Sequence, residues 1–237
     1  MYCNLIFSGN LVCYYVIRQY IEELKALDLE TILIIAYSTF ILLFGIYLRR
    51  MHIIFAGRED LFLDRLLILG ILYAVSPFPL FFLFRHNPKD YGISFGRFKQ
   101  WLRESAVFYL IMLLILLVVF KFTGMKYYYP LYRKAANGAN YFLVYQGIQF
   151  IHMLGWEFFF RGFMLFGLEK KFGKASILIQ TIPFAIMHYR KKPLEAYGSI
   201  FAGIFLGILG LRSRSFLPCF LLHFLVALSA DILGIVF

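Results

Sequence analysis

Long apolar stretches alternate with short polar segments along most of the chain. They cover residues 31–48, 66–84, 106–120, 141–168, 175–189, 196–211 and 216–237. A helix needs about 17–25 mostly apolar residues to cross the hydrocarbon core of a bilayer. Inside that core every backbone polar group must be hydrogen-bonded within the protein, which helices achieve. The pattern therefore predicts an all-α fold, a polytopic transmembrane helical bundle of about seven or eight spans.

Three features of this pattern carry further predictions: the apolar start of the chain, two prolines in the second stretch and a turn after it. Residues 1–17 are apolar but lack the basic start and the small-residue cleavage site of a signal peptide. We expect them to be retained, as a short first span or as a helix lying in the membrane interface. Pro77 and Pro79 fall inside the second stretch, where they are expected to kink or end a helix. A turn is expected at Asn87-Pro88.

The two halves of the chain differ in character. Residues 1–140 are expected to form scaffold helices, and residues 141–237 a catalytic unit within the same integrated membrane domain. The apolar helices of the second half are joined by very short basic turns, which favours antiparallel neighbours. Polar residues unusual for a lipid-facing helix gather there: Gln146, Gln149, His152, Glu157, Arg161, Gln180, His188, His223 and Asp231.

Composition excludes a soluble domain. The chain is 62% hydrophobic and 16% charged, whereas soluble domains are about 45–50% apolar and about 25% charged. The net charge of +11 could suggest nucleic acid, but Lys and Arg stand in short clusters between apolar stretches, as the flanks of membrane helices do. Membrane lipid is the expected surrounding, and no nucleic acid is expected. Twelve Lys and Arg residues on one predicted side against ten on the other leave the orientation open.

Glu157 and Arg161 are the first candidate for chemistry. On a helix their spacing of four residues stacks them on one face, within ion-pairing distance. Ionisable groups within a membrane are expensive, usually paired and often functional. The alternative is an ion pair that only stabilises the helix.

Two further helices of the second half carry His188 and His223. A carboxylate in a low-dielectric site has a raised proton affinity, which suits a general base for water. A neutral imidazole can share that proton or donate to a developing oxyanion. We therefore predict a hydrolytic set of Glu157, His188 and His223, in which Arg161 orients Glu157. His188, at a helix end before a basic turn, could equally be an ordinary interfacial residue.

The other polar positions have structural alternatives. Gln146 and Gln180 could line a wet cavity above the site, although a hydrogen bond between helices is the favoured interpretation. Gly203, Gly207 and Gly210 mark a small helix face suited to close packing.

A metal site is a further possibility for the same three residues, since zinc accepts histidine and carboxylate ligands. There is no HExxH motif, however, so a divalent metal such as zinc is only the minor alternative. The three cysteines, at positions 3, 13 and 219, have neither CxxC spacing nor the pattern of a disulfide framework.

Residues 141–231 resemble the CAAX prenyl protease and bacteriocin-processing (CPBP, or Abi) family of intramembrane proteases. The family pattern is Glu-Glu-xxx-Arg, then Phe-xxx-His, then His-xxx-Asn, on successive helices. Glu157 and Arg161 match the second Glu and the Arg. Phe184 and His188 match the second motif, and His223 opens the third. The resemblance implies that the first Glu and the second-motif His activate water, while the last His and Asn form an oxyanion site.

The chain departs from that pattern at two positions. Trp156 stands where the family has its first Glu, and Ala227 stands where it has the final Asn. Asp231 lies two turns beyond His223 and cannot simply replace Ala227.

The resemblance implies a CPBP-type endopeptidase that hydrolyses a peptide bond near the membrane surface. Water would be activated by Glu157 and His188, with His223 stabilising the oxyanion. The expected substrate is a CAAX-type prenylated tail, another membrane-embedded protein or a peptide precursor, and the expected location is the bacterial plasma membrane. The alternative is a diverged, non-catalytic member acting as a membrane binding or bacteriocin self-immunity protein. A transporter is less favoured, because no internal repeat is found.

Overall fold

The structure, a computed structural model, describes residues 3–26, 28–48 and 61–237, with side chains from residue 13 onward except 24 and 26. All regular elements of this described part are helices, which confirms the all-α prediction. The long elements are α1 (Cys3–Ala26), α2 (Leu29–Leu48), α3 (Leu61–Val75), α4 (Phe78–Phe84), α5 (Phe98–Phe122), α6 (Ala139–Glu157), the π-helix η4 (Phe158–Met164), α7 (Leu165–Phe172), α8 (Ser176–Met187), α9 (Pro193–Ser213) and α10 (Leu217–Val236). Short 3₁₀ turns are η1 (Pro88–Tyr91), η2 (Gly124–Tyr127), η3 (Arg133–Asn137) and η5 (Gly173–Ala175).

Five helical segments of the described chain are long and apolar enough to cross a membrane. They are Leu29–Leu48, Leu61–Phe84, Phe98–Phe122, Pro193–Ser213 and Leu217–Val236. Large apolar side chains on α5 point outward, among them Leu110, Leu114 and Val118, as expected for contact with lipid rather than water. The protein is thus an integral membrane helical bundle. The count of seven or eight spans stays a prediction, because it includes the stretch of α8, which has only 12 residues and is shorter than an ordinary membrane span.

The prolines of the second apolar stretch break it as predicted. Helix α3 ends at Val75, and α4 begins at Phe78, directly after Pro77. The carbonyl oxygen of Ser76, freed by this break, accepts a hydrogen bond of 2.7 Å from the Tyr37 hydroxyl on α2. The Leu80 N–H, which would bond to Ser76 in an unbroken helix, bonds to the Pro77 carbonyl instead. A neighbouring helix therefore supplies the donor that the Ser76 carbonyl loses at the break.

Glycines set how closely the helices approach. A Cβ atom on Gly155 of α6 would lie 2.0 Å from the carbonyl oxygen of Gly70 on α3, so these two backbones touch. Between α8 and α9, a Cβ on Gly203 would lie 2.7 Å from Thr181, and one on Gly207 would lie 2.9 Å from Ile177. The small face predicted on this helix is confirmed as a packing surface.

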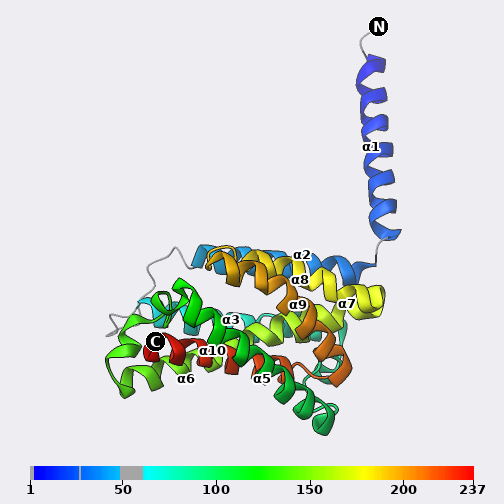
Figure 1. Cartoon of the computed structure of the whole chain (residues 1–237). Helices are drawn as coiled ribbons and strands as arrows, with labels where there is room; N and C mark the ends of the chain where they lie inside the picture. Colours follow the sequence, from blue (N-terminus) through cyan, green and yellow to red (C-terminus); the bar gives the residue numbers. More distant parts are fainter. Residues whose placement is uncertain (1–2, 27, 49–60) are drawn as a thin grey trace.

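The bundle helices run between two ends of the molecule (Figure 1), and polar side chains make contacts at each end. At one end the Lys170 ammonium lies 3.3 Å from Glu30 and 3.3 Å from the His86 ring, joining α7, α2 and the segment after α4. At the other end the Tyr129 hydroxyl donates to Glu195 over 2.8 Å, joining the segment after α5 to the start of α9. Helix α1 points away from the bundle at the first end (Figure 1).

Candidate active site

The centre of the predicted site is a buried ion pair. The side chains of Glu157 and Arg161 are both fully buried, and Arg161 Nη1 lies 3.2 Å from Glu157 Oε1. The pair predicted from the spacing of four residues therefore forms. Replacing one partner would leave an uncompensated charge inside the protein, which costs about 3–5 kcal/mol in buried pairs generally.

The backbone around Arg161 differs from the α-helix that the sequence predicts. Residues Phe158–Met164 form a π-helix, in which the Leu165 N–H reaches back to the Phe160 carbonyl. All seven residues of this segment are buried. Single-turn π segments inside α-helices are frequent at functional sites. Here the segment follows Glu157 directly and carries its partner Arg161.

His223 on α10 completes a carboxylate–imidazole pair with Glu157. Its Nδ1 lies 2.5 Å from Glu157 Oε1, the same oxygen that accepts from Arg161. An ionised carboxylate only accepts, so Nδ1 carries the hydrogen of this bond, and in the neutral form of the ring Nε2 presents a lone pair. The imidazole remains partly exposed, at 18%. Glu157 Oε2 is buried with no hydrogen-bond partner.

His188, at the end of α8, also bonds through its Nδ1 atom, but its acceptor is a backbone carbonyl and not a carboxylate. Its Nδ1 lies 2.8 Å from the carbonyl oxygen of Phe184, which can only accept. Nδ1 therefore donates, and Nε2 of the neutral ring is again the free acceptor. The rings of His188 and His223 lie 6.5 Å apart between centroids at an interplanar angle of 28°. The predicted residues are thus brought together, but Glu157 bonds to His223 and not to His188.

Phe184 occupies the space between these groups. The Arg161 guanidinium lies 3.9 Å from the centre of its ring, a cation–π contact. The same ring is 4.6 Å from His188 and 6.1 Å from His223. A desolvated cation–π contact contributes about 2 kcal/mol or more. The family pattern includes Phe184 without implying a role for it. The structure shows that its ring packs against Arg161, His188 and His223.

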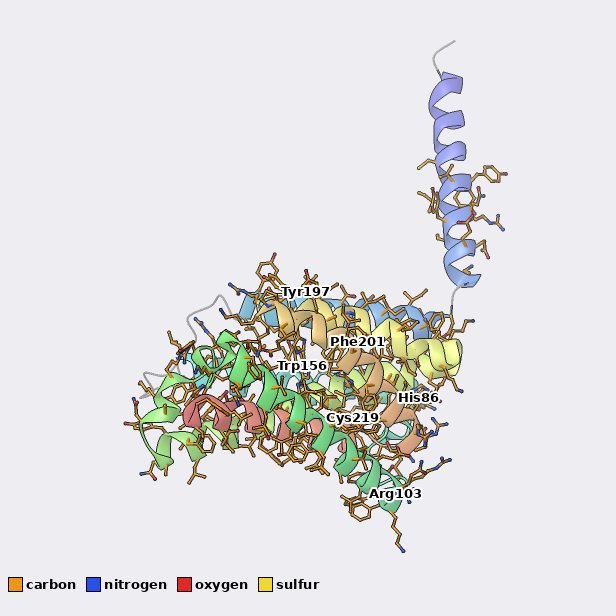
Figure 2. All side chains as sticks on the ribbon, in the orientation of Figure 1. His86, Arg103, Trp156, Tyr197, Phe201 and Cys219 are labelled. Atoms are coloured by element: carbon orange, nitrogen blue, oxygen red, sulfur yellow. The ribbon has the colours of Figure 1, made fainter. Side chains whose placement is uncertain are left out.

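Trp156 fills the position of the family's first acid with an indole in an aromatic pocket. It is 5% exposed, and its ring meets Tyr73 at 5.3 Å and His188 at 5.9 Å, both edge to face. The indole Nε1 is buried without a hydrogen-bond partner. Trp156 lies inside the bundle, whereas Tyr197 lies on its outer surface (Figure 2). No second carboxylate is supplied at position 156.

The glutamines singled out from the sequence make helix-to-helix bonds. Gln146 and Gln149 donate to Asp231 Oδ2 over 3.0 and 3.3 Å, which ties α6 to α10. Gln180 donates to the Gly203 carbonyl over 3.0 Å, which ties α8 to α9. The structural alternative is therefore the correct one for Gln146 and Gln180. The role of Asp231 was missed, although an acid two turns from His223 on an apolar helix was the available signal.

The metal alternative finds no support in the described residues. Within them, no three His, Cys, Asp or Glu side chains lie close enough together to hold a metal ion. Glu157 and His223 meet directly, whereas the His188 ring lies 6.5 Å from the His223 ring between centroids and its Nδ1 bonds to Phe184. The zinc set of Glu157, His188 and His223 is therefore not assembled in the structure.

Fold and site together define a class of protein: a membrane-embedded helical bundle with a buried carboxylate–imidazole pair beside a second imidazole. Residues 138–229 match the family described as Type II CAAX prenyl endopeptidase Rce1-like. The match spans the three motifs and confirms the resemblance to the CAAX prenyl protease family. No curated protein and no solved structure matches the chain.

Proposed function

We propose that the protein is an intramembrane endopeptidase of the CAAX prenyl protease type, which hydrolyses a peptide bond near the membrane surface. The observation that carries this proposal is the 2.5 Å contact between His223 Nδ1 and the buried Glu157 carboxylate. A structural ion pair with Arg161 alone would not need a second, titratable partner on another helix. In addition, the ring of His188, whose Nδ1 bonds to the Phe184 carbonyl, lies 6.5 Å from the His223 ring between centroids.

In the proposed reaction a water molecule lies between the two Nε2 atoms. The oxygen of this water attacks the scissile carbonyl carbon while His223 takes one of the water's protons. Glu157 stabilises the imidazolium that forms on His223. His188 accepts the second hydrogen of the water and so orients it. When the tetrahedral intermediate collapses, the C–N bond breaks and the imidazolium returns its proton to the leaving amine. General base catalysis of this kind contributes about 10²–10⁴-fold.

This assignment changes the roles expected from the sequence. The sequence suggested that Glu157 activates water together with His188, and that His223 stabilises the oxyanion. The bonding pattern favours Glu157 acting through His223, because the carboxylate bonds to that ring and because His188 Nδ1 is occupied by a backbone carbonyl.

The substrate class follows from the family and the location. We propose a peptide or membrane-embedded protein whose scissile bond reaches the site, either a prenylated C-terminal tail or a peptide precursor in a bacterial plasma membrane. A polar peptide segment would have to reach residues that are only partly exposed, such as His223 at 18%.

The direct test uses the purified protein in lipid nanodiscs with a library of peptides, including prenylated C-terminal peptides, and detects products by mass spectrometry. We expect cleavage by the unaltered protein and a loss of at least about 100-fold in the His223→Ala and His188→Ala variants. His86→Ala is the matched control, because His86 lies at the end of the bundle and bonds to Tyr91. Cleavage that survives in His223→Ala, or is absent in the unaltered protein, would overturn the proposal.

A second candidate is a non-catalytic binding or self-immunity protein on the same fold. The observations that favour it are the indole of Trp156 at the position of the first acid and the absence of a hydrogen-bonding side chain at Ala227. It predicts that Glu157→Gln and His223→Ala variants that still fold keep the full cellular phenotype. The enzymatic proposal predicts that both lose it.

A further inference from the structure

Helix α1 is an element that the proposed function does not use. It has 24 residues, yet it is not among the described helices apolar enough to cross a membrane. Its described side chains, at positions 13–23 and 25, are all exposed. Figure 2 shows them standing clear of the bundle. The helix therefore has a surface that nothing in the described chain covers.

The second half of α1 is amphipathic. One stripe, with spacings of three and four residues, consists of Cys13, Val16, Ile17, Tyr20 and Ile21. The opposite face carries Arg18, Gln19, Glu22 and Lys25 together with Tyr15, and Glu23 lies at the edge of the stripe beside Val16. Spacings of three and four residues place the apolar set on one side of a helix. An amphipathic helix with moderate overall hydrophobicity is the type that lies in a membrane interface.

The position of α1 in the fold indicates lipid as the covering partner. The helix precedes α2, which begins at the end of the bundle where Glu30 and Lys170 pair. Charged side chains such as Lys170 near the ends of membrane helices reach the membrane–water interface. From this level α1 runs crosswise to α2 and the other bundle helices (Figure 1). Because the apolar bundle helices are expected to cross the membrane, this direction lies along the membrane plane. We propose that α1 lies in the membrane interface with the stripe from Cys13 to Ile21 buried in lipid.

The charges of α1 determine whether anionic lipids should affect its burial. Arg18 and Lys25 are balanced by Glu22 and Glu23, and Lys25 pairs with Glu22 at 2.9 Å. A segment without net charge gains little from anionic headgroups. Burial of α1 should therefore depend on its apolar stripe and not on anionic lipid.

The test uses the full chain in phosphatidylcholine nanodiscs, with a spin label on Cys13 in a Cys3→Ser background. Cys219 is buried and stays in place. The matched variant carries the label on Gln19→Cys, with Cys13→Ser. We expect Cys13 to favour collisions with oxygen, which partitions into lipid, and position 19 to favour a water-soluble nickel chelate, with the ratio differing several-fold. Adding anionic lipid should leave this ratio unchanged.

Each other outcome overturns the proposal. Access of both positions to the nickel chelate means that α1 projects into water. Protection of both means that it crosses the bilayer. Dipolar broadening at Cys13 that disappears on dilution with unlabelled protein means that a second copy covers the stripe. As a check on cause, Ile17→Asp should expose Cys13 to the chelate, whereas Gln19→Asp should not. None of these readouts depends on peptidase activity.

Discussion

A single carboxylate oxygen connects the groups of the site. Glu157 Oε1 accepts from Arg161 on its own helical segment and from His223 on α10, so it links charge neutralisation to the orientation of the imidazole. In a low-dielectric interior both contacts are stronger than in water, and a missing partner is correspondingly costly. The contribution of these contacts to the stability of the fold can therefore be measured by unfolding, independently of any catalytic activity.

Replacing Arg161 with methionine should destabilise the protein by about 3–5 kcal/mol, because the Glu157 carboxylate loses its charged partner inside the bundle. The double variant Glu157→Gln with Arg161→Met should recover part of this loss, since no isolated charge remains. The measurement is unfolding of the purified variants in detergent. Arg214→Met is the control, because that pair with Glu169 is exposed and such pairs contribute about 0–1 kcal/mol. Strict additivity of the two site substitutions would contradict the coupling.

Trp156 should act through its shape and not through its N–H group. The indole Nε1 has no partner to lose, so Trp156→Phe should keep most activity and stability. Trp156→Ala should cost about 3–5 kcal/mol, as expected for removing a large buried aromatic side chain. It should also lower the turnover number, because His188 loses its edge-to-face neighbour. Thermal unfolding and turnover are compared for both variants. Equal loss in Trp156→Phe would instead assign a role to the N–H group.

At this scale the sequence predicted which residues meet and that Glu157 pairs with Arg161, but it did not predict the bond between Glu157 and His223. The motif spacing was enough to select Glu157, Arg161, His188 and His223. The choice of His223 over His188 as partner of Glu157 depends on the rotation of three helices about their axes, which no local pattern encodes. The contact of Arg161 with Phe184 depends on the same rotations.

Helix approach is the feature that matters most at the scale of elements. Gly155→Ala should destabilise the bundle strongly, since its Cβ would lie 2.0 Å from a backbone oxygen of α3 that cannot rotate away. The neighbouring Trp156 and Glu157 should move with it, lowering activity. Gly147→Ala on the same helix is the matched control, because nothing lies within 4 Å of that Cβ. We expect it to be neutral, or stabilising by up to about 1 kcal/mol through helix propensity. Similar unfolding temperatures for both variants would contradict the close contact.

The start of α2 should confer a pH-dependent contribution to stability. Asp28 accepts from the Thr31 hydroxyl at 2.6 Å and from the Thr31 N–H at 3.1 Å. The bond from the Thr31 hydroxyl is the main cause that lowers the pKa of Asp28 below its ordinary value. Because the folded-state pKa is lowered, the contribution is present above the unfolded-state pKa and is lost as pH falls through the folded-state pKa.

The measurement compares the unfolding temperature of the unaltered protein with that of Asp28→Asn between neutral and acidic pH. Asparagine caps a helix about as well as aspartate but does not titrate. We therefore expect the unaltered protein to be the more stable one at neutral pH, and the difference to shrink as Asp28 is protonated. A difference that stays constant over this range would show that the carboxylate charge has no effect.

The elements also show where local patterns stop being informative. Pro77 and the apolar run before it predicted the α3–α4 break correctly, because proline acts on its own backbone. The π-helix Phe158–Met164 was not predicted. Its apolar side chains satisfy an α-helical pattern equally well, so no local signal distinguishes the two kinds of helix.

In the whole molecule, the described segments that connect the long helices lie at two ends of the bundle. Polar contacts join the segments after α4, α7 and α9 at one end, such as Ser94 with Arg214 and Glu169 with Arg214. Contacts at the other end join the segment after α5 to the start of α9, as Tyr129 does with Glu195.

The division predicts sided chemical labelling in sealed vesicles. Cysteines placed at Lys89 and Lys174 should react with a membrane-impermeant maleimide from one side only, and those at Asn137 and Lys192 from the opposite side only. All four positions are exposed and lie in connecting segments, so substitution should not disturb the core. Reaction in intact and in permeabilised vesicles is compared in a background without Cys3 and Cys13. If Lys89 and Asn137 react from the same side, α5 does not cross the bilayer. In that case Glu157, His188 and His223 would no longer lie within a membrane-spanning bundle, and the proposed intramembrane cleavage would fail with it.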